Sequence, residues 1–332
     1  REKTVPLPEG SVVQTALMGC NGPGPLLLLS DGRYVPWDVD RMQPADLAKN
    51  DLNADPHWPF EGRIAADGQA VVLWTAGLSG QNYKLVRLRR EKNLVAVSPD
   101  SHSFNGHWAM PNPDASLVFR YGAGIYNGNL LPIASDSFKG MVLLPTEDPR
   151  FFLAVREETG TTNQVLICTS TDRQVVWTVT GVEKMTGSSL NSNWGIFGTE
   201  PRVHYLPSAG VLVNLPESND RVVVRPLNLA EALQQSGQDF LVVLSRPDSP
   251  VQPGTTFTYR MEVRSKAGGL HYTLEAGPEG MTVSDAGVVR WQVPDHLESQ
   301  TARVIITVRS SSGKEMQHAF DLTVGVPPAK SP

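Results

Sequence analysis

A polar turn followed at once by four to six apolar residues recurs five times along this chain of 332 residues. Such a repeated unit predicts short strands, each of which begins directly after a polar turn. Measured between Gly24, Asp67, Asp114, Asp148 and Ala209, the units are 43, 47, 34 and 61 residues apart, and they occupy Gly22–Gly32, Ala65–Thr75, Pro111–Gly122, Pro145–Arg156 and Leu206–Pro216. The mean spacing of about 46 residues is typical of β-propeller blades.

Further strand-like stretches follow most of these units, namely Tyr34–Val39, Tyr83–Leu88, Val165–Thr169 and Val222–Arg225. The chain contains 29 Gly and 26 Pro, and long helical patterns are nearly missing, which favours many short strands joined by turns. We therefore expect an all-β fold in which residues 1–246 form a β-propeller or propeller-like domain with about five recognisable blades of three or four antiparallel strands. Whether further blades lie outside this chain stays open.

One short helix is expected near the end of this domain. Asn228 can cap the segment 229–236, Glu231 stands three residues on as in a capping box, and Gly237 is placed to end the helix. We expect this helix to decorate the last blade rather than to define the fold.

The last part of the chain has the turn chemistry of an immunoglobulin- or cadherin-like β-sandwich, which we place at residues 247–326, before a Pro-rich tail at 327–332. Pro247, Pro250 and Pro253 predict a stiff linker at its start. Strands are expected at Thr256–Val263, Leu270–Glu275, Gly280–Ser284, Val288–Gln292, Ala302–Arg309 and Ala319–Val324. The core is expected to contain Trp291, Tyr272, Met281 and Phe320, together with the alternating residues Val304, Ile306 and Val308.

The charge balance argues against a polyanionic partner. Lys and Arg number 29 against 34 Asp and Glu, a net charge of −5, so nucleic acid is not an expected partner. No apolar run approaches the ~20 residues of a membrane-spanning helix. Cys20 and Cys168 are compatible with free thiols and with one disulfide, so they leave the redox compartment open. The polar start and the Pro-rich end suggest a piece, or a processed form, of a longer protein.

Two segments carry a resemblance to a known group: Val203–Pro247, and residues 272–291, which read YTLEAGPEGMTVSDAGVVRW. With them the chain resembles modular bacterial proteins of the planctomycete type, in which a WD-repeat-like β-propeller is followed by an immunoglobulin- or cadherin-like domain. Trp37 and Asp38 form a Trp-Asp dipeptide, whereas no Gly-His pair completes a WD signature. The resemblance implies a scaffold or binding role and supplies no catalytic residues.

The candidate metal ligands are His102 and His107 with Asp100 nearby, and the loop residues Asp51, Asn53 and Asp55. The histidine pair has no fixed third ligand. The loop has Pro56 and Gly62 where an EF-hand needs Gly and Glu. Paired carboxylates (Asp38 with Asp40, Glu157 with Glu158) sit on strands or their ends, and neither a phosphate loop nor a nucleophile elbow occurs. We therefore predict no metal, no cofactor and no catalytic residue, and favour a non-enzymatic role.

The best functional signal is the polar loop Thr186–Pro201, in which Trp194 and Phe197 lie among Gly, Ser and Asn. This composition is typical of adaptable binding loops. The two aromatic side chains either pack onto the propeller body or form part of a surface that binds a partner. On the second interpretation, Trp194 and Phe197 are the candidate partner-binding residues. The same two interpretations hold for Trp58 and Phe60.

Taken together, these features favour a non-catalytic interaction or scaffold module of a larger bacterial protein. In this interpretation the propeller binds a protein partner, and the sandwich acts as a spacer or docking domain. An extracytoplasmic location, periplasmic or at the cell surface, is favoured. Two alternatives remain: a hydrolase or lyase with a site in the propeller channel, and a carbohydrate-binding module that uses exposed aromatic side chains.

Overall fold

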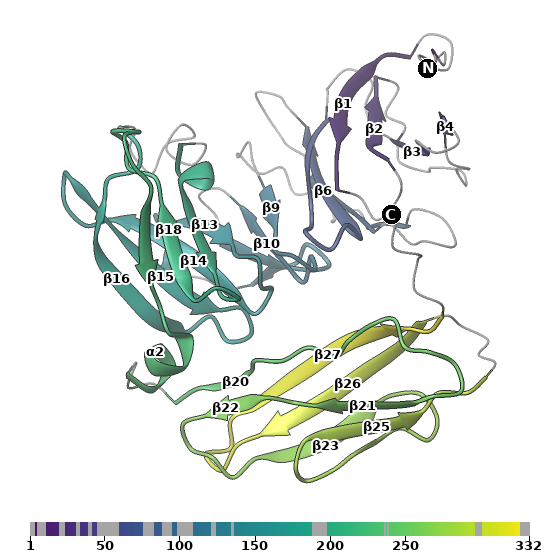
Figure 1. Ribbon diagram of the computed structural model, residues 1–332. Coiled ribbons are helices and arrows are strands. Elements are labelled where there is room, and N and C mark those ends of the chain that lie inside the picture. Colours follow the sequence, from purple (N-terminus) through teal and green to yellow (C-terminus); the bar gives the residue numbers. More distant parts are fainter. Residues whose placement is uncertain are drawn as a thin grey trace. The chain divides into compact units, whose positions relative to one another are not determined.

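The prediction of an all-β protein is confirmed by a computed structural model (Figure 1). The structure describes residues 4, 11–19, 24–30, 34–38, 42–44, 60–75, 83–87, 95–97, 109–120, 124–133, 136–187, 198–235, 237, 239–295 and 301–325. The chain divides into two compact units, Arg1–Leu229 and Ala230–Pro332, which we call unit 1 and unit 2. Short strands and turns make up most of both.

Unit 1 consists of small antiparallel sheets whose strands follow one another in chain order. The first two sheets are β1 (Val13–Leu17), β2 (Leu26–Leu29), β3 (Tyr34–Asp38) and β4 (Gln43–Pro44), then β5 (Phe60–Ile64), β6 (Ala70–Thr75), β7 (Tyr83–Arg87) and β8 (Val95–Val97). The next two are β9 (Ala109–Pro111), β10 (Leu117–Arg120), β11 (Gly124–Asn127) and β12 (Pro132–Ile133), then β13 (Val142–Pro145), β14 (Phe151–Glu157), β15 (Thr162–Thr169) and β16 (Val175–Glu183). The last described sheet has three strands, β17 (Val203–Leu206), β18 (Val211–Asn214) and β19 (Val223–Pro226).

Each of the five apolar runs in the sequence is the second strand of its own sheet: β2, β6, β10, β14 and β18. The strand-like stretches predicted after these runs are β3, β7, β15 and β19. Second strands have a neighbour on both edges, as third strands also do, and the fully buried β10 shows that such strands lie within the packed layers. The repeated unit therefore marks one sheet each.

Neighbouring sheets of unit 1 share their cores. Leu26 and Leu28 of β2 pack with Val71 and Leu73 of β6 in one cluster. A second cluster joins β10 and β14, where the Phe119 and Phe152 rings lie 5.2 Å apart. The first strands also contact each other in series, β1 with β5, β5 with β9 and β9 with β13. A sheet this small cannot bury both faces alone, so its stability depends on these neighbours.

Helix α2 (Leu229–Gln235) starts at the last residue of unit 1, where the sequence predicts a helix, and its other residues open unit 2, which continues as three small sheets around one core. The sheets are β20 (Leu241–Val243) with β22 (Val263–Ser265), then β21 (Thr256–Arg260), β25 (Val288–Gln292) and β24 (Thr282–Val283), and finally β23 (His271–Ala276), β26 (Thr301–Arg309) and β27 (Glu315–Thr323). Two of the four expected core residues, Trp291 and Met281, are buried, and the other two, Tyr272 and Phe320, pack against them. The alternation of Val304, Ile306 and Val308 is confirmed, because all three are fully buried.

The start of unit 2 differs from the predicted boundary between residues 246 and 247. Strand β20 pairs with β22, so residues 241–243 already belong to unit 2. The segment predicted as a linker is also hydrogen-bonded, because Leu244 N donates to Glu262 O (2.6 Å) and Val251 N donates to Thr323 O (2.8 Å). Prolines lack the N–H group, yet the residues between them keep theirs and pair along the unit.

The thiol of Cys168 is free and lies in the core shared by β10 and β14. Burial raises its pKa, so the side chain stays a protonated, apolar group. Cys20 lies outside the described residues. In the part of the chain that the structure describes, none of the helices is long and apolar enough to cross a membrane.

Replacing Trp291 with alanine should destabilise unit 2 by about 3–5 kcal/mol, because the side chain is 1% exposed at the centre of its core. Hydrogen–deuterium exchange of peptides covering residues 288–309 measures the effect. Trp291→Phe should lose less stability, because phenylalanine keeps most of the buried apolar side chain. Trp177→Ala in unit 1 is the control and should leave these peptides unchanged, while exchange in Trp291→Ala equal to wild type would contradict the core assignment.

Candidate functional site

Four turns join the first and second strands of successive sheets, and we call them the turn row: residues 65–70, 112–117, 146–151 and 206–211. An aspartate stands third in the first three turns, and its Oδ1 accepts the N–H two residues later. The distances are 2.8 Å from Gln69 N to Asp67, 3.0 Å from Ser116 N to Asp114, and 3.0 Å from Arg150 N to Asp148. The aspartates that mark the sequence repeat therefore close the turns.

Each turn of the row is also hydrogen-bonded to the next. The N–H of Asp67 donates to the carbonyl of Pro113 (2.9 Å). Asn112, which is fully buried, donates from Nδ2 to the carbonyl of Pro149 (3.3 Å). Ser208 donates its N–H to Glu147 Oε1 (3.0 Å), and its hydroxyl bonds the same oxygen. These contacts join sheets that are separated by 34 to 61 residues in the sequence.

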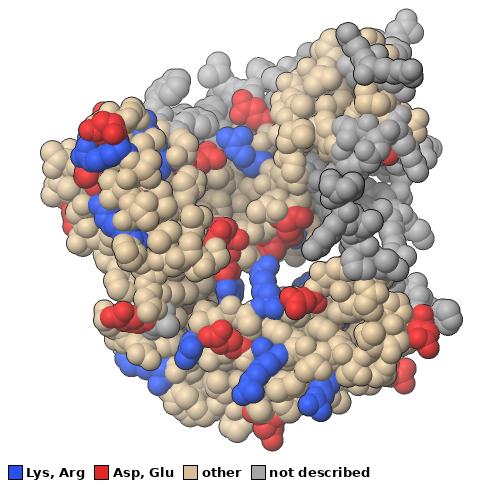
Figure 2. All heavy atoms as spheres, in the orientation of Figure 1, with Lys and Arg blue, Asp and Glu red and all other residues tan. Residues whose placement is uncertain are grey.

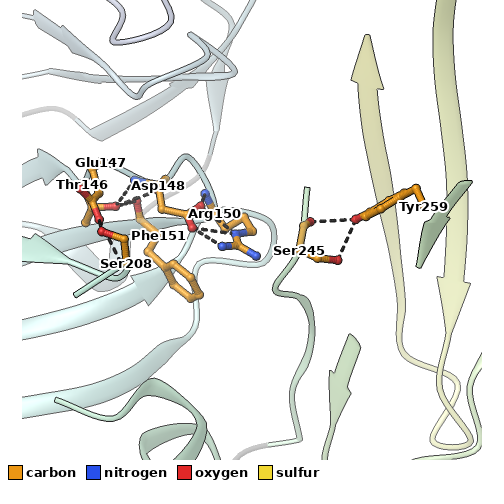
Figure 3. Close-up of polar contacts among 8 residues, drawn as sticks. All are labelled: Thr146, Glu147, Asp148, Arg150, Phe151, Ser208, Ser245 and Tyr259. Atoms are coloured by element: carbon orange, nitrogen blue, oxygen red, sulfur yellow. Dashed lines mark hydrogen bonds and ion pairs between the residues drawn. The ribbon is translucent and has the colours of Figure 1, made fainter. Parts of the chain in front are cut away.

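The third turn is the most polar of the row (Figure 3). The Thr146 hydroxyl lies 2.8 Å from the carbonyl of Asp148 and 3.1 Å from that of Phe151, and it accepts the Asp148 N–H at 3.2 Å. Arg150 Nε lies 2.7 and 2.9 Å from the two Asp148 carboxylate oxygens, and Nη2 pairs with the same group. The Arg150 guanidinium also lies over the Phe151 ring, 5.8 Å from its centre.

Tyr205 of β17 lies beneath this turn, edge-on to the Phe151 ring at 6.5 Å. The side chain is 1% exposed, and its hydroxyl has no hydrogen-bond partner in the described structure. The pKa of Tyr205 is raised from 10.0 to about 12, first by burial and then by the Asp148 carboxylate, with Arg150 acting in the opposite direction and Glu147 adding an increase. The phenol is therefore neutral at physiological pH.

The chemistry of the turn row is structural. The Asp148 carboxylate is ion-paired with Arg150 and also holds a backbone N–H, while Glu147 is occupied by Ser208. Groups held in this way order backbone rather than move protons. Within each unit, on the side drawn in Figure 2, Lys and Arg lie among Asp and Glu instead of gathering by sign. Within the described residues, no three His, Cys, Asp or Glu side chains gather to hold a metal.

A second polar cluster, in unit 2, contains Ser245 and Tyr259, which Figure 3 draws, together with His318. The Tyr259 hydroxyl donates to the Ser245 carbonyl (2.9 Å) and lies 2.8 Å from Ser245 Oγ and 3.1 Å from His318 Nε2. Ser245 Oγ accepts the Glu262 N–H (2.7 Å). The cluster fixes residue 245 against β21 and β27 and does not form a serine–histidine nucleophile pair.

The candidate partner-binding residues Trp194 and Phe197 lie outside the described residues. The two ends of their loop lie together, because a Cβ atom on Gly198 would be 2.8 Å from Thr186 Oγ1. The loop is therefore closed at its base. The remaining sequence candidates outside the description are Asp40, Asp51, Asn53, Asp55, Trp58, Asp100, His102 and His107.

Two predicted carboxylates, Glu157 and Glu158, are exposed at the end of β14, and Glu158 accepts the Gly181 N–H at 2.7 Å. Sequence reasoning missed the hydroxyls of Thr146 and Ser208. Their signal is positional, because both lie in turns that precede an apolar run of the repeat.

The chain matches no protein-family model and no curated protein. Similar solved structures include a prolyl endopeptidase (12% identity, 90% of this chain and 46% of that chain, TM-score 0.31). A second is the extracellular domain of a one-component system of B. thetaiotaomicron (9% identity, 96% of this chain and 36% of that chain, TM-score 0.23). A third is a protein described as a 6-phosphogluconolactonase of Bacteroides fragilis (13% identity, 95% of this chain and 94% of that chain, TM-score 0.27). The chain spans less than half the length of the first two. With TM-scores below 0.5, these likenesses carry no argument about fold or function.

Glu147→Ala should lower the free energy of unfolding of unit 1 by about 0.5–1.5 kcal/mol, because Ser208 loses the acceptor of its N–H and hydroxyl. Urea denaturation provides the measurement. Glu157→Ala, at another exposed glutamate, is the matched control and should change stability by less than about 0.5 kcal/mol. A double-mutant cycle with Ser208→Ala that shows no coupling would disprove the link between the turns.

Tyr205→Phe should raise the stability of unit 1 by about 1 kcal/mol near pH 7, because it removes a buried hydroxyl that lacks a partner. The pKa of Tyr205 is higher in the folded state than in the unfolded state, so above pH 10 the phenol ionises first in the unfolded chain. The free energy of unfolding of the wild type is therefore unaffected by ionisation of this group below pH 10 and falls as the pH rises from 10.0 to about 12. Urea melts at several pH values should show the gap between variant and wild type widening over that range. A constant gap would contradict the raised pKa.

Proposed function

We propose that unit 1 is propeller-like, with its sheets arranged as successive blades and their first strands innermost. Three observations support this arrangement. The first strands β1, β5, β9 and β13 contact one another in series. The turns that follow first strands are hydrogen-bonded in a row from the second sheet to the fifth. Neighbouring sheets bury apolar side chains against each other.

We further propose that the protein is a non-catalytic interaction module of a larger extracytoplasmic bacterial protein. The observation that carries this is the use of the turn-row side chains: Asp148, Arg150 and Glu147 hold backbone and neighbouring sheets in place. A scaffold built this way presents loops from fixed positions, which is the usual basis of recognition by β folds. The loop closed at Thr186 and Gly198 is one such element, and it carries Trp194 and Phe197.

Unit 2 fits the proposed role of spacer or docking domain. Its core is continuous, and the entering segment 241–251 is hydrogen-bonded to β22 and β27 rather than hanging free. A spacer domain needs an entering segment with a fixed conformation, and an anchored segment meets this need better than a flexible linker.

The experiment is cross-linked capture of proteins by the immobilised chain, identification by mass spectrometry, and affinity measurement with the purified partner. Trp194→Ala with Phe197→Ala should weaken binding about tenfold or more, because aromatic residues dominate binding energies. Met18→Ala is the matched control, since Met18 is an apolar side chain 71% exposed elsewhere in unit 1. Partner binding that the loop variant leaves unchanged would remove the loop from the proposal. Glycan binding lost in that variant would favour the carbohydrate alternative.

A further inference from the structure

The outer edge of the sheet β17-β18-β19 is unpaired in the described structure. The other sheets of unit 1 each have four described strands, and this one has three. Strand β19 pairs with β18 along one side only. An unpaired edge presents a row of backbone donors and acceptors that can template another strand.

The register determines which backbone groups point outward. Leu227 N donates to Gly210 O (2.7 Å), and Arg225 and Val223 follow at two-residue steps opposite Leu212 and Asn214. In an antiparallel pair the hydrogen-bonded positions alternate with non-bonded ones. Val224 therefore directs both its N–H and its carbonyl away from β18, toward the open edge.

The side chains at this edge are apolar and exposed. Val224 is 55% exposed, and Val222, directly before β19, is 63% exposed. Val224 stands opposite Val213 of β18, which in turn stands opposite His204 of β17. Such cross-strand rows stabilise an added strand when its residues are β-branched.

Strand β16, the outermost strand of the preceding sheet, is protected by bulges that the shorter β19 lacks, whereas Pro226 at the end of β19 removes one outward N–H. Strand β16 has two register shifts against β15, and Gly181 within it has a positive φ of 62°. Glu158 also accepts the Gly181 N–H. Bulges of this kind disrupt pairing with a further strand. Strand β19 has no register shift against β18.

The chain itself turns away after β19 instead of adding a fourth strand. Leu227 is buried, and α2 begins at Leu229. The fourth strands elsewhere in unit 1 differ in sequence: β4 reads QP, β8 reads VAV, β12 reads PI and β16 reads VVWTVTGVE. The two longer ones are rich in valine, so a longer segment at this position is expected to be rich in β-branched residues.

The charges near the start of β19 indicate which end of an added strand should carry a cationic residue. Arg221 is ion-paired with Glu183 and with Asp220, so two carboxylates share one guanidinium. Both carboxylates are well exposed, Glu183 at 40% and Asp220 at 59%. This net negative end favours a cationic residue in the occupant. In an antiparallel addition, the end of the occupant near residue 220 is its C-terminal end.

We propose that β19 is a docking edge for an extended segment of a partner protein. The segment adds antiparallel to β19 as the fourth strand, its core is rich in Val, Ile or Thr, and a Lys or Arg stands near its C-terminal end. This inference rests on the proposed interaction role and specifies the chemistry of one partner segment. It does not involve the loop that carries Trp194.

The test uses the synthetic peptide acetyl-TVTVTVRK-amide, fluorescently labelled, with the full chain, and anisotropy as the readout. Saturable binding is expected, weakened about tenfold or more by Val224→Lys, because lysine blocks an edge strand. The matched control is Thr178→Lys, also an exposed position on an outermost strand, which should bind as wild type. Circular dichroism verifies that both variants keep the wild-type fold.

Peptides methylated on alternate backbone nitrogens distinguish strand pairing from simple apolar contact. Methylation along one edge should abolish binding and methylation along the other should not, since only one edge faces β19. Equal binding of the two methylated peptides, equal binding by Val224→Lys and Thr178→Lys, or no binding at millimolar peptide would each overturn the proposal. A dimer in sedimentation that Val224→Lys abolishes would assign the edge to a second copy instead. If the chain still captures a partner protein but does not bind the peptide, only this inference is refuted and the proposed interaction role stands.

Discussion

The hydrogen bonds from one turn to the next are the constraint on which unit 1 depends. Sheets of three or four short strands are too small to bury apolar faces alone, so each must be held against its neighbour. The contact from Asp67 to Pro113, the one from Asn112 to Pro149 and the one from Ser208 to Glu147 each cross a boundary between sheets. They fix the spacing between sheets at the ends of the first strands. Apolar side chains of neighbouring sheets then pack together in shared clusters.

This arrangement explains why polar residues recur at the turns. An aspartate in the third position can hold the backbone of its own turn, while the side chain or backbone beside it reaches the next turn. The cost appears behind the third turn, where Tyr205 is buried without a hydrogen-bond partner. Its ring packs edge-on to Phe151, so apolar packing retains a residue whose hydroxyl contributes nothing favourable.

The sequence predicts strands well where they are apolar and repeated, and poorly where they are short. All second strands are visible because each is a continuous apolar run after a polar turn, whereas β9 and β12 have three and two residues and leave no periodic signal. Strand β20 was missed because its apolar residues stand before a Pro-rich segment that is typical of a linker. The aspartates of the turn row could be found from their spacing. The partners of those turns could not, since contacts between sheets leave no trace in local pattern.

Two sheet edges show the opposite ways in which this chain treats an unpaired strand. In unit 2 the segment after β20 runs beside β27, where Val251 bridges Val324 in parallel and Ser249 Oγ accepts the Thr323 N–H at 3.0 Å. That edge is closed by the chain's own backbone. At β19 the chain departs into a helix and leaves Val224 exposed on a regular strand. A bare edge of this kind is a hazard for aggregation, and the partner segment proposed above would cover it.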